Sequence, residues 1–145
     1  MNTRICFVSF IACILSLNCL GQSSDTTIYR TTEVEATFKY DNGTSAYESC
    51  KRYFLKNFKM PAILEANGDI GKIYVEFVIE KDSTISNVKV RRGMGDSLDK
   101  HVADTVKAMP RWGPGKIKGK SVRTYFIIPV SIIWLYGNEG KGITK

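Results

Sequence analysis

Cys50 and His101 are the side chains in this sequence that could form a nucleophilic pair. Such a pair works when the imidazole stabilises the thiolate. Cys50, however, lies in a stretch whose apolar residues recur every three or four positions, which predicts a small residue buried on one face of a helix. His101 is the only histidine, so a metal site built from His and Cys ligands is not expected. We therefore expect no enzymatic activity, no metal site and no cofactor.

The stretch 113–121 (GPGKIKGKS) resembles a phosphate-binding loop in composition only. That motif requires a glycine five positions before Gly119, where this chain has Pro114. The stretch also follows a predicted helix and precedes a predicted strand, the reverse of the order that places a phosphate at a helix N-terminus. We interpret it as a flexible basic connection that carries Lys116, Lys118 and Lys120. Trp112, just before it, is expected to fold back onto the core rather than to anchor a partner.

These candidate residues must be positioned by a small set of helices and strands. Apolar residues at helical spacing predict helices over residues 44–58 and 96–109. Alternation of apolar and polar residues predicts strands over 70–80 and 85–92, which form an antiparallel hairpin, and a long strand over 122–136. A weaker alternation predicts a short strand over 33–40. The simplest packing is an α+β fold, in which two helices pack on one face of a three-stranded antiparallel sheet.

The predicted strand 122–136 is the most apolar run outside the N-terminus. Pro129 has no N–H to donate, so we expect this strand at an edge of the sheet. A long apolar edge invites pairing with another chain. Alternate residues from Val122 onward are assigned to the core. We expect the opposite face to bind the partner, through Arg123, Tyr125, Ile127 and Ser131.

Composition divides the chain into four parts. Residues 1–21 resemble a secretory signal, with Arg4 before a short apolar run. Residues 22–43 are expected to be a linker, 44–136 the folded domain and 137–145 a disordered tail. We expect a periplasmic location; the alternative is an inner-membrane anchor formed by an uncleaved N-terminal segment. The net charge of +7 allows peripheral association with the cell envelope, whereas a secreted domain is not expected to bind nucleic acid.

Several motifs resemble the TonB C-terminal domain family, especially its Bacteroidetes versions. They are the strand 70–79 (IGKIYVEFVI), the sequence MPRW at 109–112, and the Gly-Lys pairs that follow at 115–116 and 119–120. The resemblance covers residues 44–133. It implies a non-enzymatic domain whose sheet binds the TonB-box segment of an outer-membrane receptor as an added strand.

Two functional hypotheses follow for this chain. The first is a TonB-like domain of TonB-dependent transport, which pairs with a receptor peptide, or with its own copy as a homodimer, by β-augmentation. The second is a secreted basic interaction or inhibitor module that binds anionic surfaces of the cell envelope.

Overall fold

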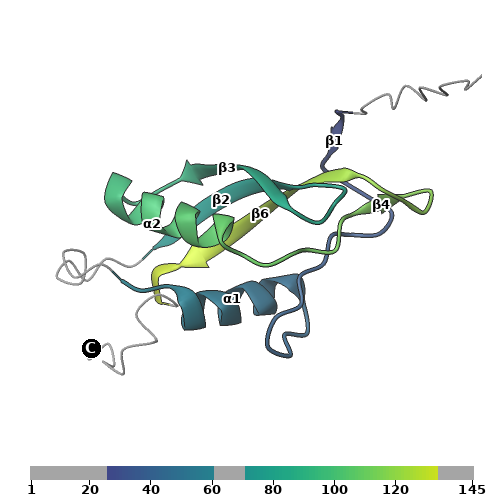
Figure 1. Cartoon of the computed structure of the whole chain (residues 1–145). Helices are drawn as coiled ribbons and strands as arrows, with labels where there is room; N and C mark the ends of the chain where they lie inside the picture. The colour runs from purple at the N-terminus through teal and green to yellow at the C-terminus, as the bar shows by residue number, and fades with distance from the viewer. Residues whose placement is uncertain (1–25, 61–70, 134–145) are drawn as a thin grey trace, which may run out of the picture.

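The computed structural model describes residues 26–60 and 71–133. The predicted signal (1–21), the predicted tail (137–145) and the last positions of the predicted strand 122–136 lie outside the described residues. The elements, shown in Figure 1, are β1 (Ile28–Tyr29), α1 (Ala46–Asn57), β2 (Lys72–Ile79), β3 (Ile85–Arg92), α2 (Asp96–Lys107), β4 (Lys116–Ile117), β5 (Lys120–Ser121) and β6 (Arg123–Ser131). Both helices and the three long strands of the prediction are confirmed, except that the last strand ends at Ser131 and does not include Ile132 and Ile133.

The main sheet has four strands in the order β1-β6-β2-β3. β2 is antiparallel to both β3 and β6, whereas β1 runs parallel to β6. The expected three-stranded antiparallel sheet is therefore wrong by one strand, and the sheet is mixed. β1 has two residues and no alternating pattern around it, so hydrophobic periodicity could not reveal it.

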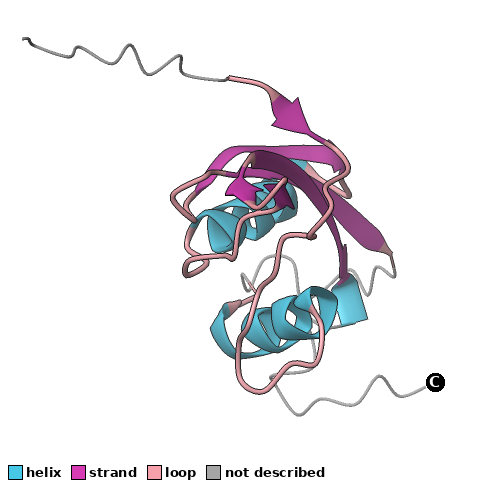
Figure 2. Ribbon diagram, turned by 90° about the vertical axis from the view of Figure 1, so that its right-hand side faces the viewer, coloured by secondary structure: helices cyan, strands magenta, loops and turns pink. Residues whose placement is uncertain are grey.

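Both helices lie on one face of the sheet, as Figure 2 shows. The Ser45 side chain caps α1 by accepting a hydrogen bond from the Glu48 N–H at 3.2 Å, which satisfies one of the free donors of the first turn. The N-cap residue of α2 is Gly95, which makes no side-chain cap hydrogen bond. The nearby Asp99 carboxylate instead accepts a hydrogen bond from the Met94 N–H at 2.9 Å.

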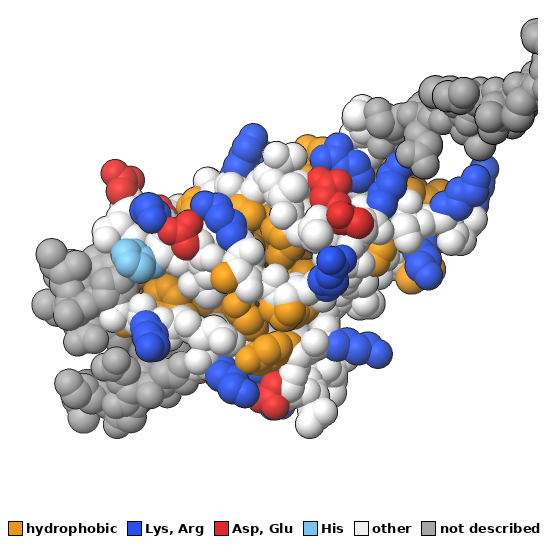
Figure 3. Space-filling model, viewed as in Figure 1, with side chains coloured by type: hydrophobic (Ala, Val, Ile, Leu, Met, Phe, Trp, Pro, Cys, Tyr) orange, Lys and Arg blue, Asp and Glu red, His pale blue; other side chains and the backbone are white. Residues whose placement is uncertain are grey.

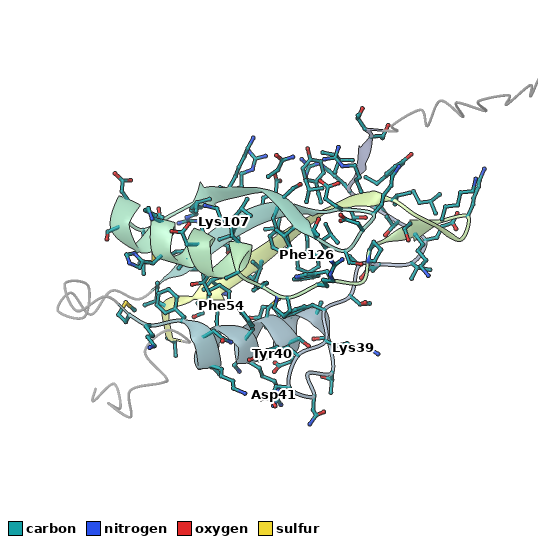
Figure 4. The ribbon with its side chains drawn as sticks, in the orientation of Figure 1. Lys39, Tyr40, Asp41, Phe54, Lys107 and Phe126 are labelled. Atoms are coloured by element: carbon teal, nitrogen blue, oxygen red, sulfur yellow. The ribbon has the colours of Figure 1, made fainter. Side chains whose placement is uncertain are left out.

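Aromatic rings fill the layer between the helices and the sheet. Trp112 stacks on Phe38, with ring centroids 4.7 Å apart, and contacts Phe77 and Phe126 at 5.3 and 4.8 Å. Figure 4 shows Phe126 on β6 and Phe54 on α1 in this layer. Trp112 is buried, which confirms that it seals the core.

The segment before α1 is more ordered than its composition suggested. Ala36 and Phe38 are buried in the core. Instead of the expected strand over 33–40, the structure has two isolated bridges, which join Val34 to Lys116 and Thr37 to Gly113. The boundary between a linker (22–43) and a domain (44–136) stays a prediction, but part of the predicted linker contributes to the core.

The expected flexible loop after Trp112 contains a small hairpin, formed by β4 and β5. Its turn residues, Lys118 and Gly119, have φ angles of +50° and +75°. Positive φ at both central residues is the geometry of a type I′ turn, which suits the twist of two-residue hairpins.

Candidate strand-docking edge

The backbone of β6 presents alternate residues to its two sides. The Ile132 N–H, just beyond the strand, donates to the Gly71 carbonyl at 3.0 Å, on the side of β2. Backbone groups of successive residues point to opposite sides of a strand. The even-numbered residues therefore bond toward β2, and the odd-numbered residues direct their N–H and C=O groups toward the other edge.

This edge contains the four residues that the sequence analysis selected, namely Arg123, Tyr125, Ile127 and Ser131. Pro129 is also an odd-numbered residue, so the position of its missing N–H faces the outer edge and not β2. The hydrogen bonds between β6 and β2 are therefore unaffected by this proline. The outward N–H groups of Arg123, Tyr125 and Ile127 thus form an unbroken row along the edge. Pro129 interrupts this row before Ser131. Their role in binding a partner remains a prediction.

The first part of the edge is already paired with β1. Ile28 lies opposite Arg123, and Tyr29 lies opposite Thr124. Of the strands in the described residues, β1 alone pairs with this side of β6. The expectation of an edge strand is therefore correct only beyond the β1 contact.

The Arg123 side chain forms an ion pair with the neighbouring strand. Its Nε and Nη2 atoms donate to the two carboxylate oxygens of Glu80 at 2.7 and 2.8 Å. The Arg123 guanidinium lowers the pKa of Glu80, and a hydrogen bond from Ser86 lowers it further. The fork geometry satisfies both carboxylate oxygens, so the Arg123 side chain is committed to the sheet.

A second carboxylate, Glu76, lies on the outer face and is only 4% exposed. Arg91 donates to it at 2.5 Å, and Arg30 approaches it at 3.6 Å. Hydrogen bonding from Arg91 is the main cause of the lowered pKa of Glu76. The Arg30 guanidinium also lies over the Tyr125 ring, 4.6 Å from its centroid. Arg30, which directly follows β1, therefore contacts side chains of both β2 and β6.

Farther along the edge the outer surface is apolar. Ile127 is 46% exposed, whereas Phe126 beside it contacts the aromatic core. The opposite sheet edge differs, because β3 carries the exposed residues Lys89, Arg91 and Arg92. Register shifts also interrupt its pairing with β2, and Asn87 has φ +51°. Charges and bulges protect sheet edges from pairing, so the β6 edge beyond β1 is the less protected of the two.

The Cys50–His101 pair considered in the sequence is not assembled. Cys50 is wholly buried, and burial raises the pKa of its thiol to about 12. His101 is exposed, visible in pale blue in Figure 3, and its Nδ1 lies 2.7 Å from the Ser97 carbonyl oxygen. It borders a cavity of about 330 Å³ between α1 and α2. The described residues contain no group of three or more His, Cys, Asp or Glu side chains placed to hold a metal ion.

The basic residues of the β4–β5 hairpin do not form an uninterrupted patch. Lys116, Lys118 and Lys120 are exposed. The Glu33 carboxylate, however, accepts a hydrogen bond from the Lys118 N–H at 2.8 Å, which brings a negative charge to the hairpin. On the face shown in Figure 3, Lys and Arg side chains are spread over the molecule and mixed with Asp and Glu.

Sequence reasoning missed three contributors to this site, namely β1, Arg30 and the buried Glu76. The signal for β1 was slight: Ile28 and Tyr29 are two adjacent strand-favouring residues in a Ser/Thr-rich stretch. Glu76 is a charged residue in an alternating strand, which gives no local sign of burial, and its burial arises from partners elsewhere in the sequence, Arg91 and Arg30.

The fold is that of a small α+β domain with a mixed four-stranded sheet. Residues 56–131 match the family model described as the Gram-negative bacterial TonB protein C-terminal, and the chain belongs to this family. No curated protein and no solved structure matches the chain. No helix in the described part of the chain is long and apolar enough to cross a membrane.

Proposed function

We propose that this domain acts in the periplasm as the receptor-binding part of a TonB-type energy transducer. Its ligand is an extended N-terminal peptide of an outer-membrane receptor, a TonB-box-like segment, which adds to the sheet along β6. Family membership supports the class of partner. The observation that carries the proposal is the run of outward backbone donors at Arg123, Tyr125 and Ile127, next to an exposed apolar side chain.

Strand addition takes its affinity from main-chain hydrogen bonds and its specificity from alternate side chains. Ile127 offers the backbone N–H at the middle of the edge and an apolar side chain on the outer face. Arg123 is neutralised by Glu80, so its contribution is mainly its backbone. A second copy of this chain could use the same edge in a homodimer, and the peptide would then compete with dimerisation.

The test is a titration with a synthetic N-terminal peptide from an outer-membrane receptor of the same cell. Replacing Ile127→Pro removes one outward N–H, and we expect the dissociation constant to rise roughly three- to tenfold, the value of about one hydrogen bond. Ile127→Val is the matched control, because it keeps the N–H and an apolar side chain. Equal affinity of the proline and valine variants would contradict pairing at this edge.

The same titration separates the proposal from its alternative, a basic module that binds anionic envelope surfaces. Binding to anionic lipid vesicles through Lys116, Lys118 and Lys120 would fall steeply as salt rises. Peptide binding through backbone hydrogen bonds is expected to change little with salt. The variant Lys118→Glu should abolish vesicle binding if the alternative holds, and leave peptide binding unchanged if the proposal holds.

A further inference from the structure

We infer that residues 26–30 act as a resident strand that occupies the docking edge and must be displaced by an incoming partner. This inference rests on the proposed function, because it concerns the regulation of the same edge. It starts from the number of donors that the edge can offer. The outward N–H groups are those of Arg123, Tyr125, Ile127 and Ser131, with none at Pro129.

A partner that avoided β1 would find too few of these donors. Beyond the β1 contact the edge retains Ile127 and Ser131, separated by the proline. The uninterrupted row is Arg123, Tyr125 and Ile127. Tyr29 lies opposite Thr124, and in a parallel pair its backbone therefore sits between the outward groups of Arg123 and Tyr125. The best part of the edge for a partner is thus the part that β1 covers.

Contacts of the Arg123 and Arg30 side chains hold the resident strand in place. Arg123 Nη1 donates to the Thr26 carbonyl oxygen at 2.9 Å. Arg30 pairs with Glu76 at 3.6 Å and lies over the Tyr125 ring. Arg123 and Tyr125, which make two of these contacts, are also among the residues predicted to bind the partner. The resident strand is therefore held by residues of the docking edge itself.

These contacts are weak enough to be exchanged. β1 pairs through two residues only, and parallel pairing is slightly less stable than antiparallel pairing. The Arg30 side chain is 65% exposed and lies 3.6 Å from the buried Glu76. Glu76 keeps a closer partner in Arg91, so loss of Arg30 would not leave this carboxylate unpaired. A receptor strand that also reaches Ile127 makes more backbone bonds than β1 and displaces it.

The consequence for binding is a reduced apparent affinity. When the competent state is a fraction of the population, the apparent dissociation constant rises by the inverse of that fraction. Tyr29→Pro removes the backbone donor that faces β6, and Arg30→Ala removes the contacts to Glu76 and Tyr125. We expect the receptor peptide to bind about threefold more tightly to the Arg30→Ala chain and about tenfold more tightly to the Tyr29→Pro chain. Arg52→Ala, an exposed arginine on α1, is the charge-matched control and should bind as the unchanged chain does.

The experiment combines amide hydrogen exchange with the peptide titration, both on the full chain. The Tyr125 amide should exchange more slowly than that of Ile127, and this protection should disappear in Tyr29→Pro. Equal exchange of the two amides in the unchanged chain would overturn the resident strand. Unchanged or weaker peptide affinity in both variants would overturn the competition while leaving the proposed function intact. Absence of peptide binding by every variant, including Arg52→Ala, would overturn the proposed function and the competition with it.

Discussion

The rings of Phe38 and Trp112 lie nearly parallel, with centroids 4.7 Å apart and planes inclined by 15°. Phe38 comes from the segment before α1, and Trp112 from the connection after α2. Their stacking joins two irregular segments to the core beneath the sheet. The Trp112 ring also contacts the Phe126 ring of β6, with centroids 4.8 Å apart, so the same ring packs against β6 on the helix side of the sheet.

Removal of this ring should be costly. Trp112→Ala is expected to lower the free energy of unfolding by about 3–5 kcal/mol, the range for deleting a buried large aromatic side chain. The Trp112 Nε1 has no hydrogen-bond partner among the described residues, so Trp112→Phe keeps the aromatic packing without that buried donor and should cost clearly less. Urea unfolding of the two variants is the measurement. Equal losses would show that stacking on Phe38 is not what the ring contributes.

Acid should weaken the pair of Glu80 and Arg123. Arg123 lowers the pKa of Glu80 in the folded chain, below the value of about 4.3 expected in the unfolded chain. The stabilisation is therefore fully present above about pH 4.3 and is lost as the pH falls through the folded pKa. The stability difference between the unchanged chain and Glu80→Gln should shrink in this acid range. A difference that stayed constant from pH 7 to pH 3 would contradict the pairing.

Pro129 should limit self-association. Pro129→Val restores an outward N–H between Ile127 and Ser131 and gives the edge an unbroken row of donors. We expect this variant to form dimers or larger species at concentrations where the unchanged chain does not, because long apolar edges pair readily. Analytical ultracentrifugation measures the outcome. Pro129→Val with an additional Ile127→Lys should return to the original state, and a variant series with no change in association would place Pro129 away from the free edge.

Cys50 should be unreactive in the folded chain. It is wholly buried, and burial raises the pKa of its thiol to about 12, so the nucleophilic thiolate is scarce at neutral pH. Alkylation followed by peptide mapping should leave Cys50 unmodified without denaturant and modify it fully in urea. Rapid alkylation of the folded chain would contradict its placement in the core.

Much of this fold could be predicted from periodicity alone. The alternation in β6 placed Val130 in the core and Ile127 outside, and burial confirms both. The order of α1, the hairpin, α2 and β6 was also predicted correctly. These elements carry long, regular patterns that a local reading detects.

The remaining features depend on contacts that no local pattern encodes. β1 is two residues long, and its strand conformation depends on its pairing with β6. The burial of Glu76 depends on Arg91 and Arg30, which reach it from two other segments. The sequence therefore predicted that Tyr125 and Ile127 lie on the side of the strand opposite the core. It did not predict that β1 pairs with the edge on which they lie.

The most direct test of strand addition at β6 is amide hydrogen exchange of the full chain with and without the receptor peptide. The peptide should slow exchange at Ile127, whose outward N–H is free of β1, and leave the amides of the charged β3 edge, such as Lys89, unchanged. Protection at β3 or at the helices, with Ile127 unaffected, would contradict the docking of a partner strand on β6.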